Sequence, residues 1–266
     1  MTQNVVKGPF SVAVITNIPA PYRQKQWEHY TTIRNLSITV FYCGKSDKDR
    51  FWDVRPASGV REVFLRGLSY RKWHFNPSIF LLPFQKFDLF LVGGYGFPTV
   101  VIAIVLLRLF NKNWTMMMDG IAPPRLKTEK WYVNAIQRFF TKGANAYFFN
   151  GTAAKVWLKQ FGIADEKIFD QYLTVDVSYF TENEKASIER RILTRTRYDI
   201  NKDVVVVMYV GRLVKHKGIR DLIHAIKNLV ENKNYDVVAL IVGEGEQRDS
   251  LELEAKNLNG HVVFTG

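Results

Sequence analysis

The sequence has few of the features that mark secreted, disulfide-bonded or membrane-spanning proteins. Its single cysteine, Cys43, excludes a disulfide within the chain and fits a reducing compartment. The most apolar run, residues 98–110, is shorter than the roughly 20 residues that a membrane-spanning helix needs, and it contains Arg108. The polar N-terminus does not resemble a signal peptide. We therefore expect a buried helix at 98–110 and a cytoplasmic protein.

Several kinds of catalytic site are also missing. The sequence contains neither the G-x-S-x-G turn of hydrolases nor a phosphate-binding P-loop. Cys43 ends a predicted strand, which favours a core position over a role as a nucleophile. The histidines lack the spacing of metal ligands; they are His29, His74, His216, His224 and His261. We therefore expect no metal and no bound cofactor.

Acidic residues are scarce in the first part of the chain. Residues 1–150 contain 20 Lys and Arg against 8 Asp and Glu, whereas residues 151–266 contain 17 of each. The formal net charge of +12 therefore comes from the first part. This surplus indicates an anionic partner, such as a phospholipid surface, a lipid pyrophosphate or nucleic acid, or else a generally basic surface without a dedicated partner. Because no recognisable nucleic-acid-binding module is present, we expect no nucleic acid.

Short apolar runs alternate with helix-like segments along most of the chain, which predicts parallel α/β sheets of the doubly wound kind. The predicted strands are 12–16, 37–43, 63–66, 88–93, 114–118, 144–150, 204–210, 236–242 and 261–265. The predicted helices are 23–33, 78–86, 99–110, 128–142, 152–161, 219–231 and 247–258. We expect a first domain at 1–172, a charge-rich connection containing a helix at 173–201, and a second domain at 202–266. Three strands make half of a doubly wound domain, so one apolar edge of this second sheet would lie bare.

Two loops of the second domain follow predicted strands. In the first, Gly211 ends a strand, and Arg212 and Lys217 follow in the loop. Ligands of open α/β sheets bind at the carboxyl ends of strands, and these cations suit a diphosphate. A solvated basic loop is the alternative. The second loop contains Gly243, Glu244 and Gly245, which permit a tight turn and close backbone approach; by itself it also fits an ordinary strand–helix turn.

Taken together, these two loops with their strands and helices resemble the second domain of glycosyltransferase family 4, over residues 203–266. The resemblance implies a GT-B fold with two Rossmann-like domains, in which Arg212 and Lys217 contact the diphosphate of a UDP- or GDP-sugar donor. It also implies transfer with retention of anomeric configuration. Family members continue with a P-S-x-x-E-G-F-G stretch and a Glu-x7-Glu pair that would lie beyond Gly266. The second domain is therefore expected to be incomplete.

The first domain resembles bacterial capsule and exopolysaccharide glycosyltransferases of this family more loosely, at loops that would face the cleft. Asn17, Pro21 and Arg23 belong to one such loop, where Arg23 could pair with an anionic acceptor or donor phosphate. Gly93 and Gly94 form a second loop, after a predicted buried strand. A rigid strand-to-helix turn and a plain loop are the respective alternatives.

Asp119 follows the predicted strand 114–118, near the place where family members have a histidine or acidic residue close to the transferred sugar. We therefore predict it as the catalytic residue, with a turn or helix-capping aspartate as the alternative. Asn150 belongs to a further loop, after the last strand of the first domain, that resembles a loop of the family.

The sequence thus predicts a retaining glycosyltransferase that moves a sugar from a nucleotide sugar to a lipid-linked or polysaccharide acceptor. A lipid pyrophosphate acceptor would place it at the inner face of a membrane, where its basic first domain would meet an anionic surface. The alternatives are a non-catalytic, truncated remnant or partner-binding domain, and a sugar-nucleotide epimerase with the same fold.

Overall fold

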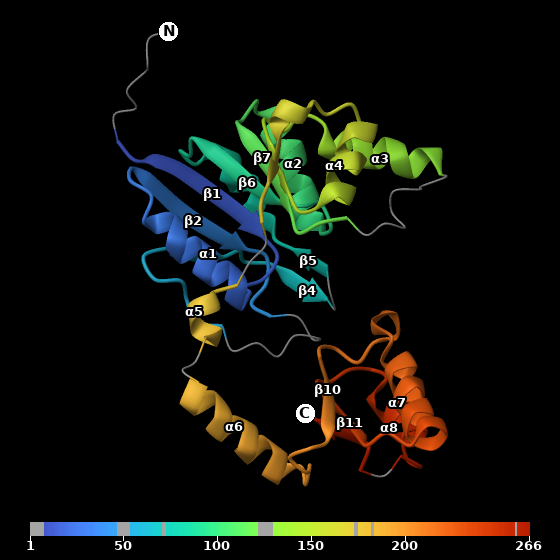
Figure 1. Cartoon of the computed structure of the whole chain (residues 1–266). Coiled ribbons are helices and arrows are strands. Elements are labelled where there is room, and N and C mark those ends of the chain that lie inside the picture. Colours follow the sequence, from blue (N-terminus) through green and yellow to red (C-terminus); the bar gives the residue numbers. More distant parts are fainter. Residues whose placement is uncertain are drawn as a thin grey trace. The chain divides into compact units, whose positions relative to one another are not determined.

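The computed structural model divides the chain into two compact units, Met1–Asp176 and Val177–Gly266. Each unit is described by itself (Figure 1). The structure describes residues 8–46, 54–70, 73–121, 130–172, 175–181, 184–258 and 260–266. The first two residues of the predicted helix 128–142 lie outside this described part, as do positions 173–174 and 182–183 of the predicted connection.

Unit 1 is built on a seven-stranded sheet in the order β3-β2-β1-β6-β7-β8-β9, and every neighbouring pair runs parallel. Its strands are β1 (Phe10–Thr16), β2 (Leu36–Tyr42), β3 (Arg61–Phe64), β6 (Leu89–Gly93), β7 (Trp114–Met118), β8 (Tyr147–Phe149) and β9 (Ile168–Asp170). From β1 the chain builds outward to β2 and β3, and then returns to the other side of β1 with β6. The prediction of a doubly wound parallel sheet is confirmed.

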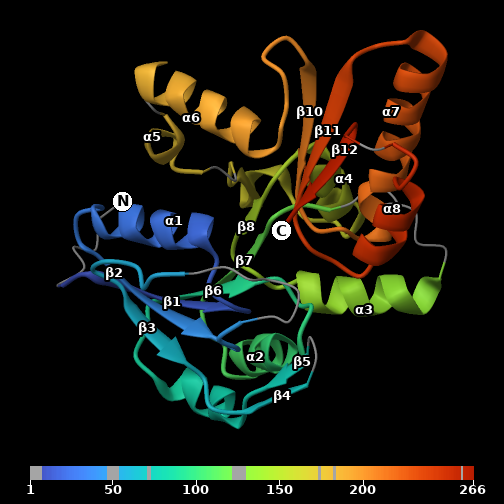
Figure 2. The ribbon, with the colours of Figure 1, turned by 90° about the horizontal axis from the view of Figure 1, so that it is seen from below.

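Helices cover both faces of this sheet. Consecutive residues of β1, β2 and β7 are buried, and successive side chains of a strand point to opposite faces, so both faces are covered. The helices are α1 (Pro21–Thr31), α2 (Pro98–Leu109), α3 (Trp131–Thr141) and α4 (Thr152–Gln160), with the 3-10 helices η1 (Pro77–Phe84) and η3 (Asp165–Lys167). Ala13 and Ile15 of β1 share one core with α2, α4 and η1, whereas Val12 and Val14 share the other with Trp27 of α1. Figure 2 shows α1 and α2 on opposite sides of the sheet.

A buried polar network fixes α1 against β2 and β3. The Tyr42 hydroxyl donates to Gln24 Oε1 at 2.7 Å, and Gln24 Nε2 donates to Glu62 Oε1 at 2.6 Å. Burial, and then the neighbouring Glu62, raise the pKa of Tyr42, so its hydroxyl stays a donor. These bonds hold the helix that begins at Pro21 in one position over the sheet.

The apolar run at 98–110 forms α2, and its inner residues Val100, Ala103, Ile104 and Leu107 are buried, as predicted. None of the helices in the described part of the chain combines the length and apolar character needed to cross a bilayer. The lone Cys43 is buried beside α2, and burial raises the pKa of its thiol to about 12. Cys43 is therefore protonated at neutral pH, in agreement with the predicted core position.

Unit 2 contains a three-stranded parallel sheet in the order β10-β11-β12. Its elements are α5 (Val177–Phe180), α6 (Glu184–Arg197), β10 (Val205–Val210), η4 (Lys215–Lys217), α7 (Ile219–Lys233), β11 (Val237–Val242), α8 (Arg248–Glu254) and β12 (Val262–Thr265). Helices α7 and α8 pack on one face through Ile223, Ile226 and Leu251. Val205, Met208 and Val210 of β10 are largely exposed, so apolar surface lies bare on this strand.

The structure adds three strands to the predicted pattern. An antiparallel hairpin joins β4 (Leu68–Tyr70) to β5 (Trp73–Phe75), and β9 forms the last strand of the large sheet. The boundary between the two units follows Asp176, a few residues after the predicted domain end at 172. The helix expected in the connection is α6, and it is grouped with unit 2.

Candidate functional site

The centre of the large sheet in unit 1 is a topological switch point. Strands β1 and β6 are neighbours there, and the chain leaves them toward opposite edges of the sheet. Loops at such a point separate and leave a crevice at the carboxyl ends of the strands, where open α/β sheets bind ligands. Asn17 follows β1, and Gly93 ends β6 with Gly94 after it. The structure therefore places both predicted cleft loops at this point.

Glycine suits the end of β6 and the position that follows it. A Cβ atom on Gly93 would lie 3.1 Å from the carbonyl oxygen of Ile15, and Gly94 has a φ of +76° that favours glycine. The side-chain oxygen of Asn17 is buried and accepts no hydrogen bond from the described residues. The ends of β1 and β6 thus pack closely at the switch point, and one buried acceptor beside them is unsatisfied among the described residues.

The structure joins Arg23 and Asp119, which lie 96 positions apart in the sequence. Pro21 is the first residue of α1, where its fixed φ suits a helix start, and it places Arg23 in the first turn. Asp119 directly follows β7. The Nη2 atom of Arg23 forms an ion pair with Asp119 Oδ1. The predicted cleft arginine and the predicted catalytic aspartate are therefore bound to one another as an ion pair.

The guanidinium of Arg23 is enclosed by the protein. Only 9% of its side chain is exposed, whereas 51% of the Asp119 side chain is exposed. Its Nη1 atom donates to Gln26 Oε1 and lies 3.6 Å from the Met117 sulfur. The rings of Tyr22 and Trp27 lie 5.6 and 5.9 Å from its central carbon, within reach of a cation–π interaction. The charge is thus held inside unit 1, and the carboxylate faces solvent.

Two further polar side chains belong to this cluster. Asn150, after β8, donates from Nδ2 to the backbone oxygen of Asp119 at 3.2 Å. Gln171, after β9, lies with its amide against Arg23 and accepts from Nη2 at 3.1 Å in the orientation that satisfies both groups. The loop of Asn150 is one of those predicted from the resemblance to the family. Gln171 was missed because the short strand that positions it was missed.

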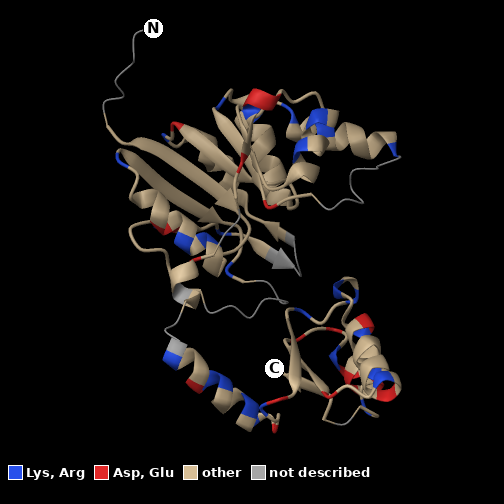
Figure 3. Cartoon of the chain, viewed as in Figure 1, with Lys and Arg blue, Asp and Glu red and all other residues tan. Residues whose placement is uncertain are grey.

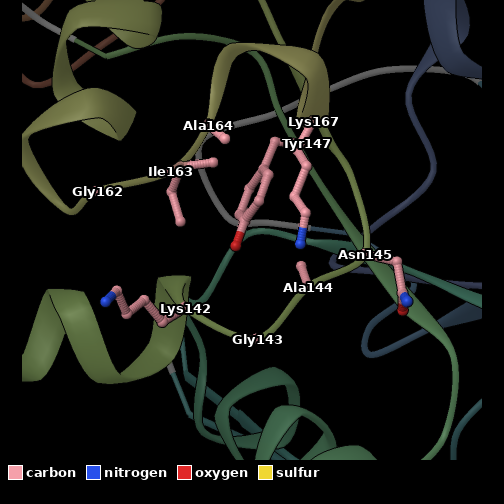
Figure 4. A pocket seen from close by; sticks show the side chains of 9 residues that line it. All are labelled: Lys142, Gly143, Ala144, Asn145, Tyr147, Gly162, Ile163, Ala164 and Lys167. Atoms are coloured by element: carbon pink, nitrogen blue, oxygen red, sulfur yellow. The ribbon is translucent and has the colours of Figure 1, made fainter.

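A pocket at the opposite edge of the sheet contains none of the predicted site residues. Figure 4 shows its lining, which comes from the turns before β8 and after α4. The pocket has a volume of about 320 Å³ and includes Lys142, Lys167 and Tyr147. The Tyr147 hydroxyl donates to the Thr141 backbone oxygen at 2.7 Å, and burial raises its pKa to about 12. This phenol therefore has a structural hydrogen bond at neutral pH.

In unit 2, the loops after β10 and β11 are tied to one another. Leu213 donates its backbone N–H to the Glu244 oxygen at 2.9 Å, and the Gln247 N–H donates to the Leu213 oxygen at 3.0 Å. Cβ atoms would clash in this contact: on Gly243 at 2.1 Å from the Gly211 oxygen, and on Gly245 at 2.4 Å from the Leu213 oxygen. The two predicted donor-side loops therefore form one compact edge.

The cations of this edge occupy different environments. Arg212 is half-buried, and its backbone oxygen accepts from the Tyr209 hydroxyl at 3.0 Å. Lys217 is exposed at the end of η4, just before Gly218, whose left-handed φ of +69° leads into α7. The Glu244 carboxylate is paired with Arg248. Within the described residues, no three His, Cys, Asp or Glu side chains gather as a metal site would need.

Comparisons with known proteins find similarity to glycosyltransferases. Residues 191–266 match the model of the family "Glycosyl transferases group 1", and this range includes both loops of the unit 2 edge. Over 69 residues the chain is 36% identical to the capsular polysaccharide biosynthesis glycosyltransferase CapM of Staphylococcus aureus, covering 26% of this chain and 18% of CapM. It is 22% identical over 208 residues to the uncharacterized glycosyltransferase MJ1069 of Methanocaldococcus jannaschii, covering 71% of this chain and 51% of that one.

Among solved structures, Anabaena HepE in complex with UDP is similar with a TM-score of 0.65 and 16% identity, over 96% of this chain and 69% of HepE. The fold is of the GT-B type. The chain spans about half or less of the curated relatives that it matches. The assignment to family 4, and the roles of the individual site residues, stay predictions.

Proposed function

We propose that the chain takes part in transferring a sugar from a nucleotide sugar to an acceptor hydroxyl, with unit 1 on the acceptor side and unit 2 on the donor side. The observation that carries this proposal is the edge of unit 2. There, two glycine-dependent loops and two cations stand at the carboxyl ends of parallel strands, inside the range that matches the glycosyltransferase family. A nucleotide diphosphate fits such an edge by charge and by backbone approach.

Arg212 and Lys217 would stabilise the negative charge that develops on the departing diphosphate. Arg provides parallel N–H donors for two oxygens, and Lys provides a mobile point charge. HepE, which shares the fold, has been solved with UDP and with UDP-glucose. We propose a UDP- or GDP-sugar as the donor, with retention through front-face attack, in which the departing diphosphate helps to deprotonate the acceptor hydroxyl. These cations would make a metal unnecessary.

Asp119 would contact the acceptor sugar. Arg23 holds its Oδ1, and the Tyr22 hydroxyl lies 3.4 Å from its Oδ2. The carboxylate can accept a hydrogen bond from a sugar hydroxyl, because half of its side chain is exposed. We propose that Arg23 positions this carboxylate. Its pairing with a phosphate of the acceptor or donor, predicted from the sequence, stays a prediction.

The acceptor class follows from charge. The basic surplus lies in residues 1–150, and an acceptor carried on a lipid pyrophosphate presents anionic groups at a membrane surface. We therefore propose a lipid-linked or glycan acceptor and peripheral contact of unit 1 with an anionic membrane. The salt dependence of membrane binding is a direct consequence of this proposal.

The donor assignment can be tested by calorimetric titration of the whole chain with UDP and with GDP. Arg212→Ala and Lys217→Ala should each weaken binding of the preferred nucleotide by about tenfold or more, because each removes a charge-assisted contact. Lys215→Ala is the matched control, since Lys215 is an exposed cation of the same loop and should leave affinity unchanged. If neither nucleotide binds, or if all three variants bind alike, the donor assignment fails and the non-catalytic, partner-binding alternative is favoured.

A further inference from the structure

Unit 1 exposes large apolar side chains on three neighbouring elements. Leu81 and Phe84 of η1 are 66% and 67% exposed, and Leu109 at the end of α2 is 73% exposed. On α3, Ile136 and Phe139 are about half exposed. Burial of each of these side chains away from water would be favourable. Contiguous exposed patches of this kind mark interaction surfaces.

The three elements form one face. The Phe84 ring meets the Phe110 ring at 4.9 Å between centroids, which joins η1 to the end of α2. The Arg108 side chain donates to the Phe139 oxygen and lies 4.5 Å from the Phe139 ring centroid, which joins α2 to α3. Figure 2 shows α2 and α3 at neighbouring positions in unit 1. We call the surface made by Leu81, Phe84, Leu109, Phe110, Ile136 and Phe139 the η1–α2–α3 face.

These side chains are surplus to the core. The inner side of α3 consists of Val133, Gln137, Phe140 and Thr141, which are buried or half-buried, and Phe140 stacks on Tyr95 of the core. Ile136 and Phe139 lie on the flank beside this inner side, three positions apart, so they share one stripe of the helix. The helix therefore has an apolar flank that the fold of unit 1 does not use.

The segments that form this face are basic. Segments 77–113 and 130–142 contain six Lys and Arg and one acidic residue, Asp88. Asp88 accepts hydrogen bonds from the backbone and the hydroxyl of Ser11. The basic residues are Lys86, Arg108, Lys112, Lys130, Arg138 and Lys142. Figure 3 shows no acidic residue on α2 or α3. Apolar and aromatic side chains bordered by cations are the combination that inserts into the interface of an anionic bilayer.

We propose that the η1–α2–α3 face is the surface by which unit 1 lies on an anionic lipid bilayer. Leu109, Ile136 and the two Phe rings would enter the boundary between headgroups and acyl chains. Arg138 and Lys130 would reach the phosphates, as long basic side chains do at such interfaces. The proposal rests on the proposed function only for the reason why a membrane is visited. The docking itself requires no sugar transfer.

The test is flotation of the whole chain with two kinds of vesicle. One is made of phosphatidylcholine alone, and in the other about one lipid in three is phosphatidylglycerol. We expect binding to the anionic vesicles that falls in high salt. Leu109→Ser with Ile136→Ser should lower the bound fraction at least about tenfold, because two exposed apolar side chains are lost. Lys130→Gln with Arg138→Gln should lower binding mainly at low salt.

The matched control is Ile188→Ser with Ile192→Ser on α6, two residues of similar exposure in unit 2, which should bind as the unchanged chain does. Equal binding by all variants, or equal loss in the control, would overturn the proposal. So would self-association that the Leu109 and Ile136 substitutions abolish while vesicle binding is absent, because a second copy would then cover this face. UDP and GDP titration of the Leu109 and Ile136 variant separates this outcome from failure of the donor assignment, since both residues belong to unit 1 and the proposed donor site belongs to unit 2.

Discussion

The pairing of Arg23 with Asp119 decides what each residue can do. An arginine whose side chain is nine-tenths buried would be costly without a counter-charge, and Asp119 supplies one. In return, the guanidinium fixes one carboxylate oxygen and leaves the exposed side of the group toward solvent. Tyr22 and Asn150 contact the same aspartate through its side chain and backbone. Asp119 is therefore a positioned carboxylate, as a residue that binds a sugar hydroxyl needs to be.

A double-mutant cycle should reveal this coupling. Arg23→Ala, Asp119→Ala and the double variant should give a coupling free energy of about 1 kcal/mol or more in unfolding stability, since one partner is buried and the other half-exposed. The measurement is urea unfolding followed by tryptophan fluorescence. The control cycle uses Lys159→Ala and Asp165→Ala, an ion pair of 2.7 Å with both side chains about half exposed. A coupling no larger than that of the control would show that Arg23 does not hold Asp119 in place.

At the scale of elements, the edge of unit 2 depends on how closely β10 and β11 bring their following loops together. The 2.4 Å approach that a Cβ on Gly245 would make is to a backbone oxygen, that of Leu213. The backbone cannot withdraw easily, because Leu213 is itself hydrogen-bonded to Glu244 and Gln247. Gly245 therefore sets the spacing of the two loops that carry the proposed diphosphate site.

Gly245→Ala should destabilise unit 2 by about 1–3 kcal/mol, the usual cost of forcing extra volume into a packed contact. Far-UV circular dichroism in urea measures the change. Tryptophan fluorescence serves as an internal reference, because all six tryptophans lie in residues 27–157 and report on unit 1 alone. Gly96→Ala is the matched control, since nothing lies within 4 Å of its added Cβ. A loss for Gly245→Ala as small as that for Gly96→Ala would mean that the loops can separate freely.

The long elements could be predicted from the sequence, but three of the shortest strands, β4, β5 and β9, could not. Strands β1, β6 and β11 are apolar runs bounded by turn residues, so periodicity and length define them. By contrast, β9 has three residues, and its place follows from pairing with β8 rather than from its own pattern. The hairpin of β4 and β5 is equally short. Gln171 follows β9, and because that strand was not predicted, Gln171 was not predicted as a site residue either.

The sequence also predicted which residues stand at the sheet edges, but not which of them touch. Strand ends identify Asn17, Gly93 and Asp119 as neighbours along one edge, because parallel strands all end there. The ion pair between Arg23 and Asp119 depends on the position of α1, which the buried bonds among Tyr42, Gln24 and Glu62 fix. Arg23 lies in a helix and Asp119 follows a strand, 96 positions apart. No rule of sequence spacing relates two such residues.

At the scale of the whole molecule, the two units have separate cores. Buried residues of unit 1 gather on the two faces of its seven-stranded sheet. Those of unit 2 gather around α7, α8 and the sheet of β10, β11 and β12. No buried residue is common to both sets among the described residues. Units with cores of their own are able to fold on their own.

A fragment of residues 1–176 should therefore fold alone, and its unfolding free energy should lie within about 1 kcal/mol of that of unit 1 in the whole chain, which is near the error of the extrapolation. Urea unfolding followed by tryptophan fluorescence measures both, since both contain every tryptophan. The control fragment 1–164 lacks β9 and the Gln171 contact with Arg23. It leaves the edge of β8 unpaired, so it should be clearly less stable. Equal stability of the two fragments would show that β9 adds nothing to the sheet. A fragment 1–176 that fails to unfold cooperatively would show that unit 1 depends on unit 2 for its structure, and the acceptor-side cluster would then have to be studied only in the intact chain.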